Sequence, residues 1–361
     1  MLRTPLYEAH LRAGARIVPF AGYDMPVQYD SVIAEAKAVR GGVGMFDVSH
    51  MARLRLTGPE IVDALEAITV NEVSALADGR GHYSLLTNRN GGVVDDIILY
   101  RESETEFMMV VNAANHAKDA AWLRAELPES VTLEDRTDAT AMIAVQGPTA
   151  TETLAGLSPD GEAIRTAPMF GIVRTSIADV PVWMARSGYT GEDGFELVPS
   201  ADDADRLWEA LRTAGVAPCG LASRDTLRVE AGLPLYGHEL SDELSPIAAG
   251  LGWVISKTKS FLGSEIIAEH RAQGTPTKLQ GIRLASKRLL MPEMAVHRGN
   301  TLDGDLVGRI SSGVYSPLLE CGIGFAFLTA DLKVGTEVCV DIRGKAEPAV
   351  VANKRFFKRS A

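Results

Sequence analysis

Two adjacent carboxylates stand in an otherwise apolar segment of the chain. Asp95 and Asp96 lie in Gly91-Gly-Val-Val-Asp-Asp-Ile-Ile-Leu-Tyr100, whose β-branched and aliphatic residues predict a strand. Successive residues of a strand face opposite sides, so one carboxylate is expected to point inward and the other outward. Because an unpaired buried charge is costly, the inward carboxylate needs either a chemical task or a structural role, as a salt bridge or a cap.

A second candidate site is the glycine-spaced hairpin Ser187-Gly-Tyr-Thr-Gly-Glu-Asp-Gly-Phe-Glu196. Its glycines allow the backbone to approach a ligand closely, and Tyr189 and Glu196 stand on either side of the turn. An ordinary β-turn covered by a packed tyrosine would explain the same pattern.

A third candidate is the helix-like run Leu221–Ala231, in which Arg224 and Arg228 are four residues apart. This spacing places both arginines on one side of a helix, where an acidic partner can join them. On its own, the pattern indicates a surface ion-pair face.

The elements that position these residues follow one pattern twice. An alternating segment, Met51–Thr57, leads into Gly58-Pro59, where a helix is expected to begin. The buried segment Ala141–Val145 leads in the same way into Gln146-Gly-Pro148. Strands and a second helix follow in both cases, which predicts two ferredoxin-like α+β units.

After about residue 275, short apolar stretches are separated by turn residues, which predicts a C-terminal all-β barrel or jelly-roll-like domain. The fold class is therefore α+β. We expect one α+β domain from residues 1–50 with 140–240. A second, carrying the aspartate pair, would come from residues 51–139 with 241–275, and the β domain from residues 276–361.

Composition excludes several classes of protein. The 361 residues are 46% hydrophobic and 23% charged, which is ordinary for a globular chain. A net charge of −11 argues against nucleic-acid or anionic-membrane partners. The three widely spaced cysteines indicate reduced thiols, and no signal peptide or long apolar run is present, so we expect a cytoplasmic protein. The glycine and histidine patterns of flavin, NAD, nucleotide and zinc sites are absent, so none of these cofactors and no metal is predicted.

Taken together, the motifs resemble the aminomethyltransferase (T-protein) family of the glycine cleavage system. The resemblance runs from Thr4 to the last ten residues. Its motifs are Gly44-Met-Phe-Asp-Val-Ser-His-Met51, Gly92-Val-Val-Asp-Asp96, Val111-Asn112-Ala-Ala, Gln146-Gly-Pro148, Gly188-Tyr-Thr-Gly-Glu192, Cys219-Gly-Leu-Ala-Ser-Arg-Asp-Thr-Leu-Arg-Val-Glu-Ala231 and Leu235-Tyr-Gly-His-Glu239.

The resemblance implies three domains arranged like a cloverleaf around a central tetrahydrofolate channel. It also implies a partner, the lipoylated H-protein, whose lipoyl arm carries an aminomethyl group. The methylene carbon of that group would pass to tetrahydrofolate as co-substrate. The products would be 5,10-methylenetetrahydrofolate, ammonia and dihydrolipoyl H-protein.

The same resemblance assigns roles to individual residues. The family's essential aspartate falls on Asp96, which would orient or activate the folate amine by positioning and electrostatics. Glu196 would accept hydrogen bonds from the amino edge of the pterin, and Arg224 would bind a carboxylate of the folate. The positions expected to line the folate site are Met51, Tyr83, Tyr100, Asn112, Tyr189, Glu196 and Arg224.

The chain departs from the family pattern at Tyr23, often tryptophan, at Ser223, usually alanine or glycine, and at Arg355, usually proline. The basic tail Lys354-Arg-Phe-Phe-Lys-Arg359 is expected to be a solvated end; the alternative is a contact with polyglutamate or with the H-protein.

Other members of the fold remain as alternatives. One is another folate-dependent demethylase or methyltransferase, as in the folate domains of sarcosine and dimethylglycine dehydrogenases. Another is a non-catalytic folate-binding protein of iron–sulfur assembly, whose relatives have a Lys-Gly-Cys stretch near Leu235-Tyr236.

Overall fold

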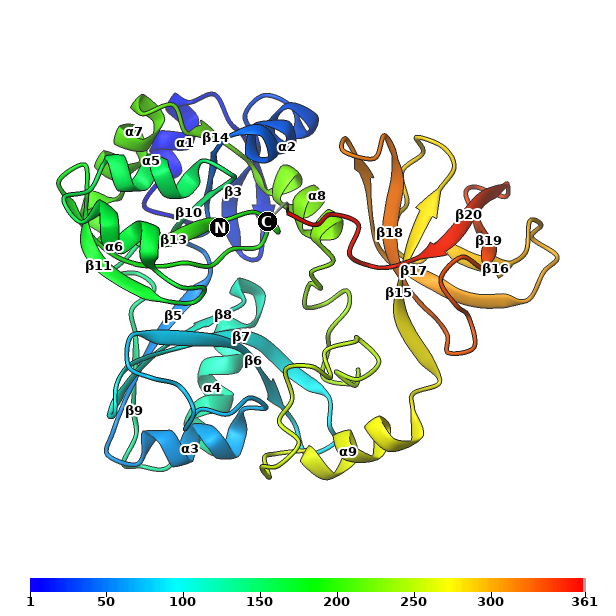
Figure 1. Cartoon of the computed structure of the whole chain (residues 1–361), viewed down its shortest axis with the longest axis horizontal. Helices are drawn as coiled ribbons and strands as arrows, with labels where there is room; N and C mark the ends of the chain where they lie inside the picture. Colours follow the sequence, from blue (N-terminus) through cyan, green and yellow to red (C-terminus); the bar gives the residue numbers. More distant parts are fainter. Residues whose placement is uncertain (360–361) are drawn as a thin grey trace. The chain divides into compact units, whose positions relative to one another are not determined.

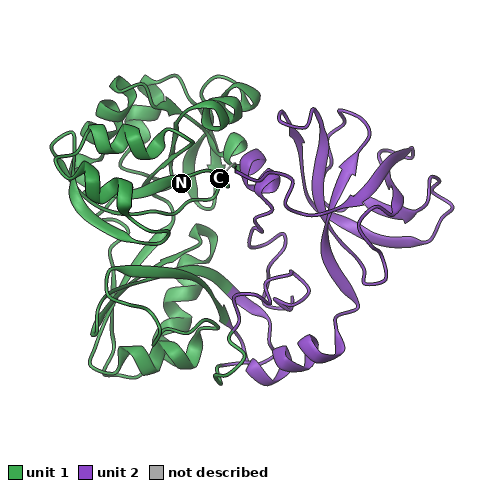
Figure 2. Cartoon of the chain, in the orientation of Figure 1, with its two compact units in different colours: residues 1–86, 95–224, 256–261 green, residues 87–94, 225–255, 262–361 purple. Residues whose placement is uncertain are grey.

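The computed structural model describes residues 1–359 and divides them into two compact units (Figures 1 and 2). Unit 1 comprises Met1–Leu86, Asp95–Arg224 and Ser256–Phe261. Unit 2 comprises Thr87–Val94, Asp225–Ile255 and the described residues from Leu262 onward. The aspartate pair and the glycine-spaced hairpin both belong to unit 1. The boundary between the units falls directly after Arg224.

A five-stranded sheet holds the aspartate pair, with strand order β6-β7-β8-β5-β9. Its strands are β5 (Ala52–Thr57), β6 (Arg80–Thr87), β7 (Val93–Ser103), β8 (Glu106–Val111) and β9 (Thr132–Asp135). Helix α3 (Ile61–Ile68) follows Gly58-Pro59 as predicted, and buries Ile61, Leu65 and Ile68 on one face. A 3₁₀ turn, η1 (Ala113–Asn115), leads into α4 (His116–Glu126).

A six-stranded sheet holds the glycine-spaced hairpin, with strand order β11-β12-β13-β10-β4-β14. Its strands are β4 (Gly44–Asp47), β10 (Ile143–Gln146), β11 (Ile172–Ile177), β12 (Val180–Ala185), β13 (Gly194–Val198) and β14 (Ala217–Pro218). Its helices and 3₁₀ turn are α5 (Ala150–Gly156), α6 (Gly161–Thr166), η2 (Ala201–Asp203) and α7 (Ala204–Thr213). One apolar core includes side chains from β10, β12, β13 and α7.

The N-terminal segment forms a small sheet of its own, β1-β3-β2, with strands β1 (Leu2–Arg3), β2 (Arg16–Phe20) and β3 (Tyr23–Gln28). In the chain, helix α1 (Tyr7–Arg12) lies between β1 and β2, and helix α2 (Val32–Gly41) follows β3. Ser31 caps α2 by accepting a hydrogen bond from the N–H of Ala34, as an N-cap serine is expected to do.

Unit 2 contains a closed barrel with strand order β15-β18-β17-β16-β19-β20 (Figure 1). The strands are β15 (Thr277–Leu284), β16 (Ala295–Arg298), β17 (Leu306–Ser316), β18 (Cys321–Thr329), β19 (Glu337–Asp341) and β20 (Ala346–Ala352). Helix α9 (Ser264–Gln273) precedes the barrel. Helix α8 (Leu221–Ala231) begins in unit 1 and continues in unit 2.

The predicted α+β class with a C-terminal β-barrel is confirmed. Ser200 caps the turn before α7 by accepting from the N–H of Asp203, and Gly215 follows that helix with φ of 88°. The N-terminal sheet was not predicted, because its short strands show no clear alternation. The three-domain boundaries stay a prediction.

Candidate functional site

The aspartate pair lies on β7 beside the end of β8. The antiparallel register pairs Ile98 with Val110, which brings Asn112 opposite Asp96 at the end of the ladder. Asp95 is fully buried, and Asp96 is partly exposed. We expected one carboxylate to point inward and the other outward. The two differ in exposure, but they share one partner, because the Asn112 side chain donates a hydrogen bond to each of them.

Asp95 is surrounded by hydrogen-bond donors. Oδ2 accepts from the backbone N–H of Asn112 at 2.9 Å, and Oδ1 accepts from Asn112 Nδ2 at 2.9 Å and from Asn115 Nδ2 at 2.6 Å. Asp95 is thus fixed beside Asp96 by the backbone and side chain of Asn112 and by the side chain of Asn115.

Asp96 has fewer donors and a different electrostatic state. Oδ1 accepts from Asn112 Nδ2 at 2.8 Å, and Oδ2 accepts from the Tyr83 hydroxyl at 3.1 Å. Burial first, and then the charge of Asp95, raise the pKa of Asp96 to about 7, although both hydrogen bonds favour the carboxylate. The pKa of Tyr83 is raised well above its usual value by burial and by Asp96, so its phenol remains a donor. Asp96 can therefore hold or release a proton near neutral pH.

A line of hydrogen bonds runs from the same face of β7 to the hairpin. Tyr100, which is buried and lies about 13 Å along the strand from Asp96, donates to Ser187 Oγ at 3.1 Å. Ser187 Oγ donates to Glu196 Oε2 at 2.6 Å, and no bond among the described residues uses Oε1 of Glu196. Gly81 on β6 is required here, since a Cβ at that position would lie 2.3 Å from the Tyr100 ring.

The hairpin is held by Gln146, whose role the sequence analysis missed. Gln146 Nε2 donates to the carbonyl of Ser187 at 2.9 Å, and its Oε1 accepts from Thr190 Oγ1 at 2.9 Å. A Cβ at Gly188 would lie 1.8 Å from Gln146 Oε1. Gly188 therefore makes room for this amide, so the ligand-approach interpretation is not needed at that position. The available signal is the Gln146-Gly-Pro148 motif, which predicts a helix start and carries part of the resemblance but gives no role to the Gln146 amide.

Arg224 lies over the hairpin tyrosine. Its guanidinium carbon is 5.0 Å from the centre of the Tyr189 ring and 6.0 Å from that of Phe46. The side chain is partly exposed, yet its Nη1 is buried and has no hydrogen-bond partner among the described residues. Burial lowers the pKa of Arg224, while the nearby charge of Glu196 raises it. A buried donor without a partner costs about 1–3 kcal/mol, which a ligand oxygen bound at this position would recover.

Met51 and His50 lie in the turn between β4 and β5. The backbone N–H of Met51 donates to the carbonyl of Val48, and its side chain is partly exposed. His50 is buried, and its Nδ1 has no hydrogen-bond partner among the residues described. Burial lowers the pKa of His50 to about 4, and the charge of Arg224 contributes in the same direction. His50 is therefore neutral near pH 7; only the Ser-His-Met motif pointed to it.

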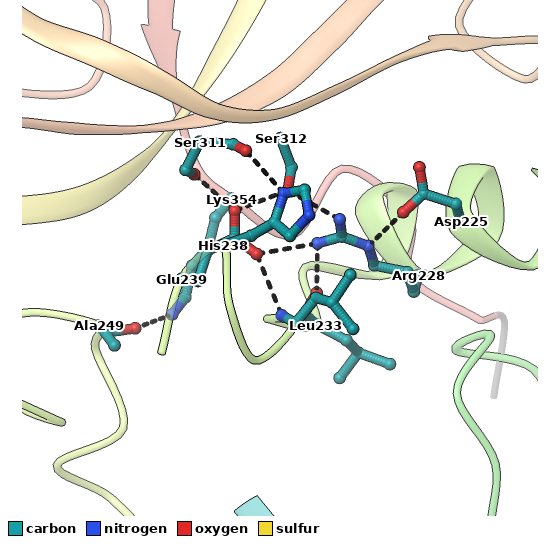
Figure 3. Close-up of polar contacts among 10 residues, drawn as sticks. Asp225, Arg228, Leu233, His238, Glu239, Ala249, Ser311, Ser312 and Lys354 are labelled. Atoms are coloured by element: carbon teal, nitrogen blue, oxygen red, sulfur yellow. Dashed lines mark hydrogen bonds and ion pairs between the residues drawn. The ribbon is translucent and has the colours of Figure 1, made fainter. Parts of the chain in front are cut away.

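Arg228 departs from the expectation of a surface ion-pair face. It is 1% exposed and donates to Asp225 Oδ1 at 2.8 Å, Glu239 Oε2 at 3.0 Å and Ser312 Oγ at 2.7 Å (Figure 3). Oε1 of Glu239 accepts from Ser311 Oγ at 2.5 Å and from Ser312 Oγ at 2.7 Å. A bulge in β17 brings both serines to the carboxylate. The polar groups of this cluster bind one another, which is typical of a structural network within unit 2.

The basic tail is docked at its start, which corrects the expectation of a solvated end. Lys354 Nζ donates to the carbonyl of Ala249 at 2.7 Å (Figure 3). The Phe356 ring stacks on Phe325, and the backbone N–H of Phe357 donates to the carbonyl of Glu230 at 2.7 Å. Arg355, Lys358 and Arg359 are exposed.

Within residues 1–359, no group of three or more histidine, cysteine or acidic side chains is placed to hold a metal ion. In the same residues, no helix combines the length and the apolar character needed to cross a membrane.

The comparisons with known proteins agree along the whole chain. The family signature "GCVT N-terminal domain" matches residues 6–259, and "Glycine cleavage T-protein C-terminal barrel domain" matches residues 278–358. An aminomethyltransferase of Thermus thermophilus is 46% identical over 358 residues, covering 99% of each chain. One of Synechococcus is 41% identical over 363 residues, again covering 99% of each. The crystal structure of glycine cleavage system aminomethyltransferase T from Bartonella henselae superposes with a TM-score of 0.91 at 31% identity, covering 99% of this chain and 98% of that one.

Proposed function

The chain belongs to the glycine cleavage T-protein family of aminomethyltransferases, and from that premise we propose that the groups around Asp96 bind tetrahydrofolate and promote transfer of a methylene carbon to it. The donor in this proposal is the aminomethyl group on the lipoyl arm of the H-protein. The observation that carries the proposal is the state of Asp96, a carboxyl of raised pKa held by Tyr83 and Asn112.

The reaction moves one carbon without any change in its oxidation state. The carbon–nitrogen bond of the aminomethyl group breaks and ammonia leaves, and the carbon–sulfur bond breaks and returns the thiol to the lipoyl arm. Two bonds form from the methylene carbon to two nitrogens of tetrahydrofolate. The folate amines lose two protons, and the departing ammonia and thiol take them up. The chemistry therefore needs a nearby group that can accept and return protons near neutral pH.

Asp96 suits this task because its pKa is close to 7. As a carboxylate, it would accept a hydrogen bond from the folate amine and stabilise the positive charge that develops as the nitrogen attacks the carbon. A folate amine already has a lone pair, so Asp96 need not remove its proton before attack. The proton becomes acidic after the new bond forms, and Asp96 can take it up at that stage.

The remaining groups supply binding. Oε1 of Glu196 is available to accept from the amino edge of the pterin, while Oε2 is held by Ser187. Tyr100 supports that serine, and the Tyr189 ring offers an aromatic surface. The unpartnered Nη1 of Arg224 fits a carboxylate of the folate. Met51, next to the buried His50, is proposed to line the same site.

The decisive measurement is ammonia release from aminomethylated H-protein, with and without tetrahydrofolate. We expect strong stimulation by tetrahydrofolate, with methylenetetrahydrofolate appearing at the same rate. Asp96→Asn should retain folate binding and lose most turnover, whereas Asp63→Asn, which changes an exposed carboxylate on α3, should behave like the unchanged enzyme. Folate binding without ammonia release would contradict the proposed donor and favour a methyl donor instead.

A further inference from the structure

A buried glutamate on α2 joins that helix to the start of α8. Glu35 is 4% exposed, and its Oε2 accepts from the backbone N–H of Gly220 and from Ser223 Oγ, both at 2.8 Å. Its Oε1 accepts from the backbone N–H groups of Tyr29 at 2.6 Å and Asp30 at 3.2 Å. Four donors thus surround a carboxylate with almost no contact with water.

These contacts define where α8 begins. The N–H of Arg224 donates to the carbonyl of Gly220, so Gly220 stands at the N-cap position, and Ser223 Oγ donates to the same carbonyl at 2.9 Å. A negative charge at a helix N-terminus is stabilised by the unpaired N–H groups and the helix dipole. A Cβ at Gly220 would lie 2.3 Å from the backbone of Val27, so this position also packs directly on β3.

Arg224 follows Ser223 immediately and depends on this arrangement. Its contacts among the described residues are with the Tyr189 and Phe46 rings, and its Nη1 has no hydrogen-bond partner. Because no ion pair within residues 1–359 holds the guanidinium, its position is set by the backbone of the first turn of α8 together with the two rings. The other end of α2 holds the hairpin, since Arg40 Nη1 donates to the carbonyl of Thr190 at 2.8 Å. One helix therefore sets the positions of both Arg224 and Tyr189.

We infer that Glu35, together with Ser223, is a positioning residue for Arg224 and so controls the affinity of the enzyme for folate. This inference rests on the proposed function, in which Arg224 binds the folate. In this inference, Glu35 touches no substrate and affects folate binding through the first turn of α8.

The test separates affinity from turnover. Glu35→Gln keeps the shape of the side chain but replaces one carboxylate oxygen with an NH2 group. That group cannot accept the hydrogen bonds that the neighbouring N–H and O–H groups donate. The variant should raise the KM for tetrahydrofolate about tenfold while kcat stays within about twofold. Ser223→Ala removes one hydrogen bond and introduces a good helix former, so it should fold normally and raise that KM about threefold. Because Ser223→Ala is so mild, the inference can be tested even if Glu35→Gln does not fold.

Ser200→Ala is the matched control. It also removes a side-chain cap, that of the turn before α7, but the hydrogen bonds of this side chain are with Asp203 and involve neither α2 nor α8, so the KM should not move. In an Arg224→Ala background, Glu35→Gln should have no further effect on the KM. If Glu35→Gln raised the KM equally with and without Arg224, the inference would be wrong. It would also be wrong if Arg224→Ala raised the KM but Glu35→Gln and Ser223→Ala did not. Either result would leave the proposed function intact. A normal folate affinity in Arg224→Ala would overturn the assignment of Arg224, and the inference with it.

Discussion

The ionisation of Asp96 should make the folded protein less stable as the pH rises, and Asp96→Asn should remove that loss. In the folded chain, the pKa of Asp96 is about 7, against an ordinary value of 3.8 for an aspartate side chain. Between these values the unfolded chain releases the proton while the folded chain keeps it. Stability therefore falls as the pH rises from about 4 to about 7, and the deficit is complete above that range. Asparagine does not titrate, so the variant lacks this dependence.

The size of the effect follows from the shift. A difference of about three pKa units corresponds to about 4 kcal/mol. Asp96 is partly exposed, and water reduces the penalty, so we expect roughly half of this value. We compare the free energy of unfolding of Asp96→Asn with that of the wild-type protein. The difference in favour of the variant should grow by about 1.5 kcal/mol from about pH 5 to about pH 8. The same change should abolish most folate-dependent ammonia release, so stability and activity should move in opposite directions.

Urea unfolding at intervals of pH, followed by tryptophan fluorescence, measures the difference directly. Asp63→Asn serves as the control for removal of one exposed charge. Parallel stability profiles for Asp96→Asn and the unchanged protein would show that Asp96 has an ordinary pKa and would refute the reasoning. In the unchanged enzyme, we expect kcat/KM for tetrahydrofolate to rise with pH and to level off above about pH 7.

Three further changes test other parts of the structure. Ser187→Ala interrupts the line from Tyr100 to Glu196 and should weaken tetrahydrofolate binding about tenfold; unchanged binding by equilibrium titration would leave the serine a structural role. Asp47 is buried and bonds His10 Nε2 at 2.8 Å. Burial alone would raise its pKa, but hydrogen bonds from His10, Ser49 and Thr4 outweigh burial and lower it to about 2. Asp47→Asn should therefore cost about 3 kcal/mol at neutral pH. That cost should fade as the pH falls from about 4 to about 2, and urea unfolding across this range would expose an error. Exchanging Arg355, Lys358 and Arg359 for glutamine should leave the affinities for the H-protein and for polyglutamylated folate unchanged; a loss of either would give the tail a binding role.

The sequence predicted most elements of the two large sheets and the barrel because their apolar residues recur with the period of a strand or helix. It placed α8 at Leu221–Ala231, where the structure has it. It could not predict the register between β7 and β8. That register depends on side chains that meet only in the folded sheet, and it is what brings Asn112 to Asp95 and Asp96.

The candidate site was predicted to the extent that its residues sit in recognisable motifs. Hydrogen bonds join Asp96 to Tyr83 and Asn112, and join Tyr100 to Glu196 through Ser187. That these residues line a folate site stays a prediction. The supporting residues were not found. Gln146 and His50 lie in quoted motifs, but those motifs give no contact for their side chains, and nothing in the local sequence singles out Glu35. The contacts of Gln146 and Glu35 are with residues far away in the chain.

Two arginines of unit 1 show that the burial of a charged side chain must be considered together with its hydrogen bonds. Arg53 belongs to strand β5 and is fully buried. Its nitrogens donate to the carbonyls of Ser49, Met51, Thr137 and Thr140 and to the Thr140 hydroxyl. Arg224 is more exposed but leaves a buried nitrogen without a partner. The cost of desolvating Arg53 is offset by these hydrogen bonds, whereas Arg224 has the Tyr189 and Phe46 rings and the charge of Glu196 nearby but no hydrogen-bond partner for Nη1 among the described residues. Arg53 is therefore a structural residue, and Arg224 is the arginine that a ligand should stabilise.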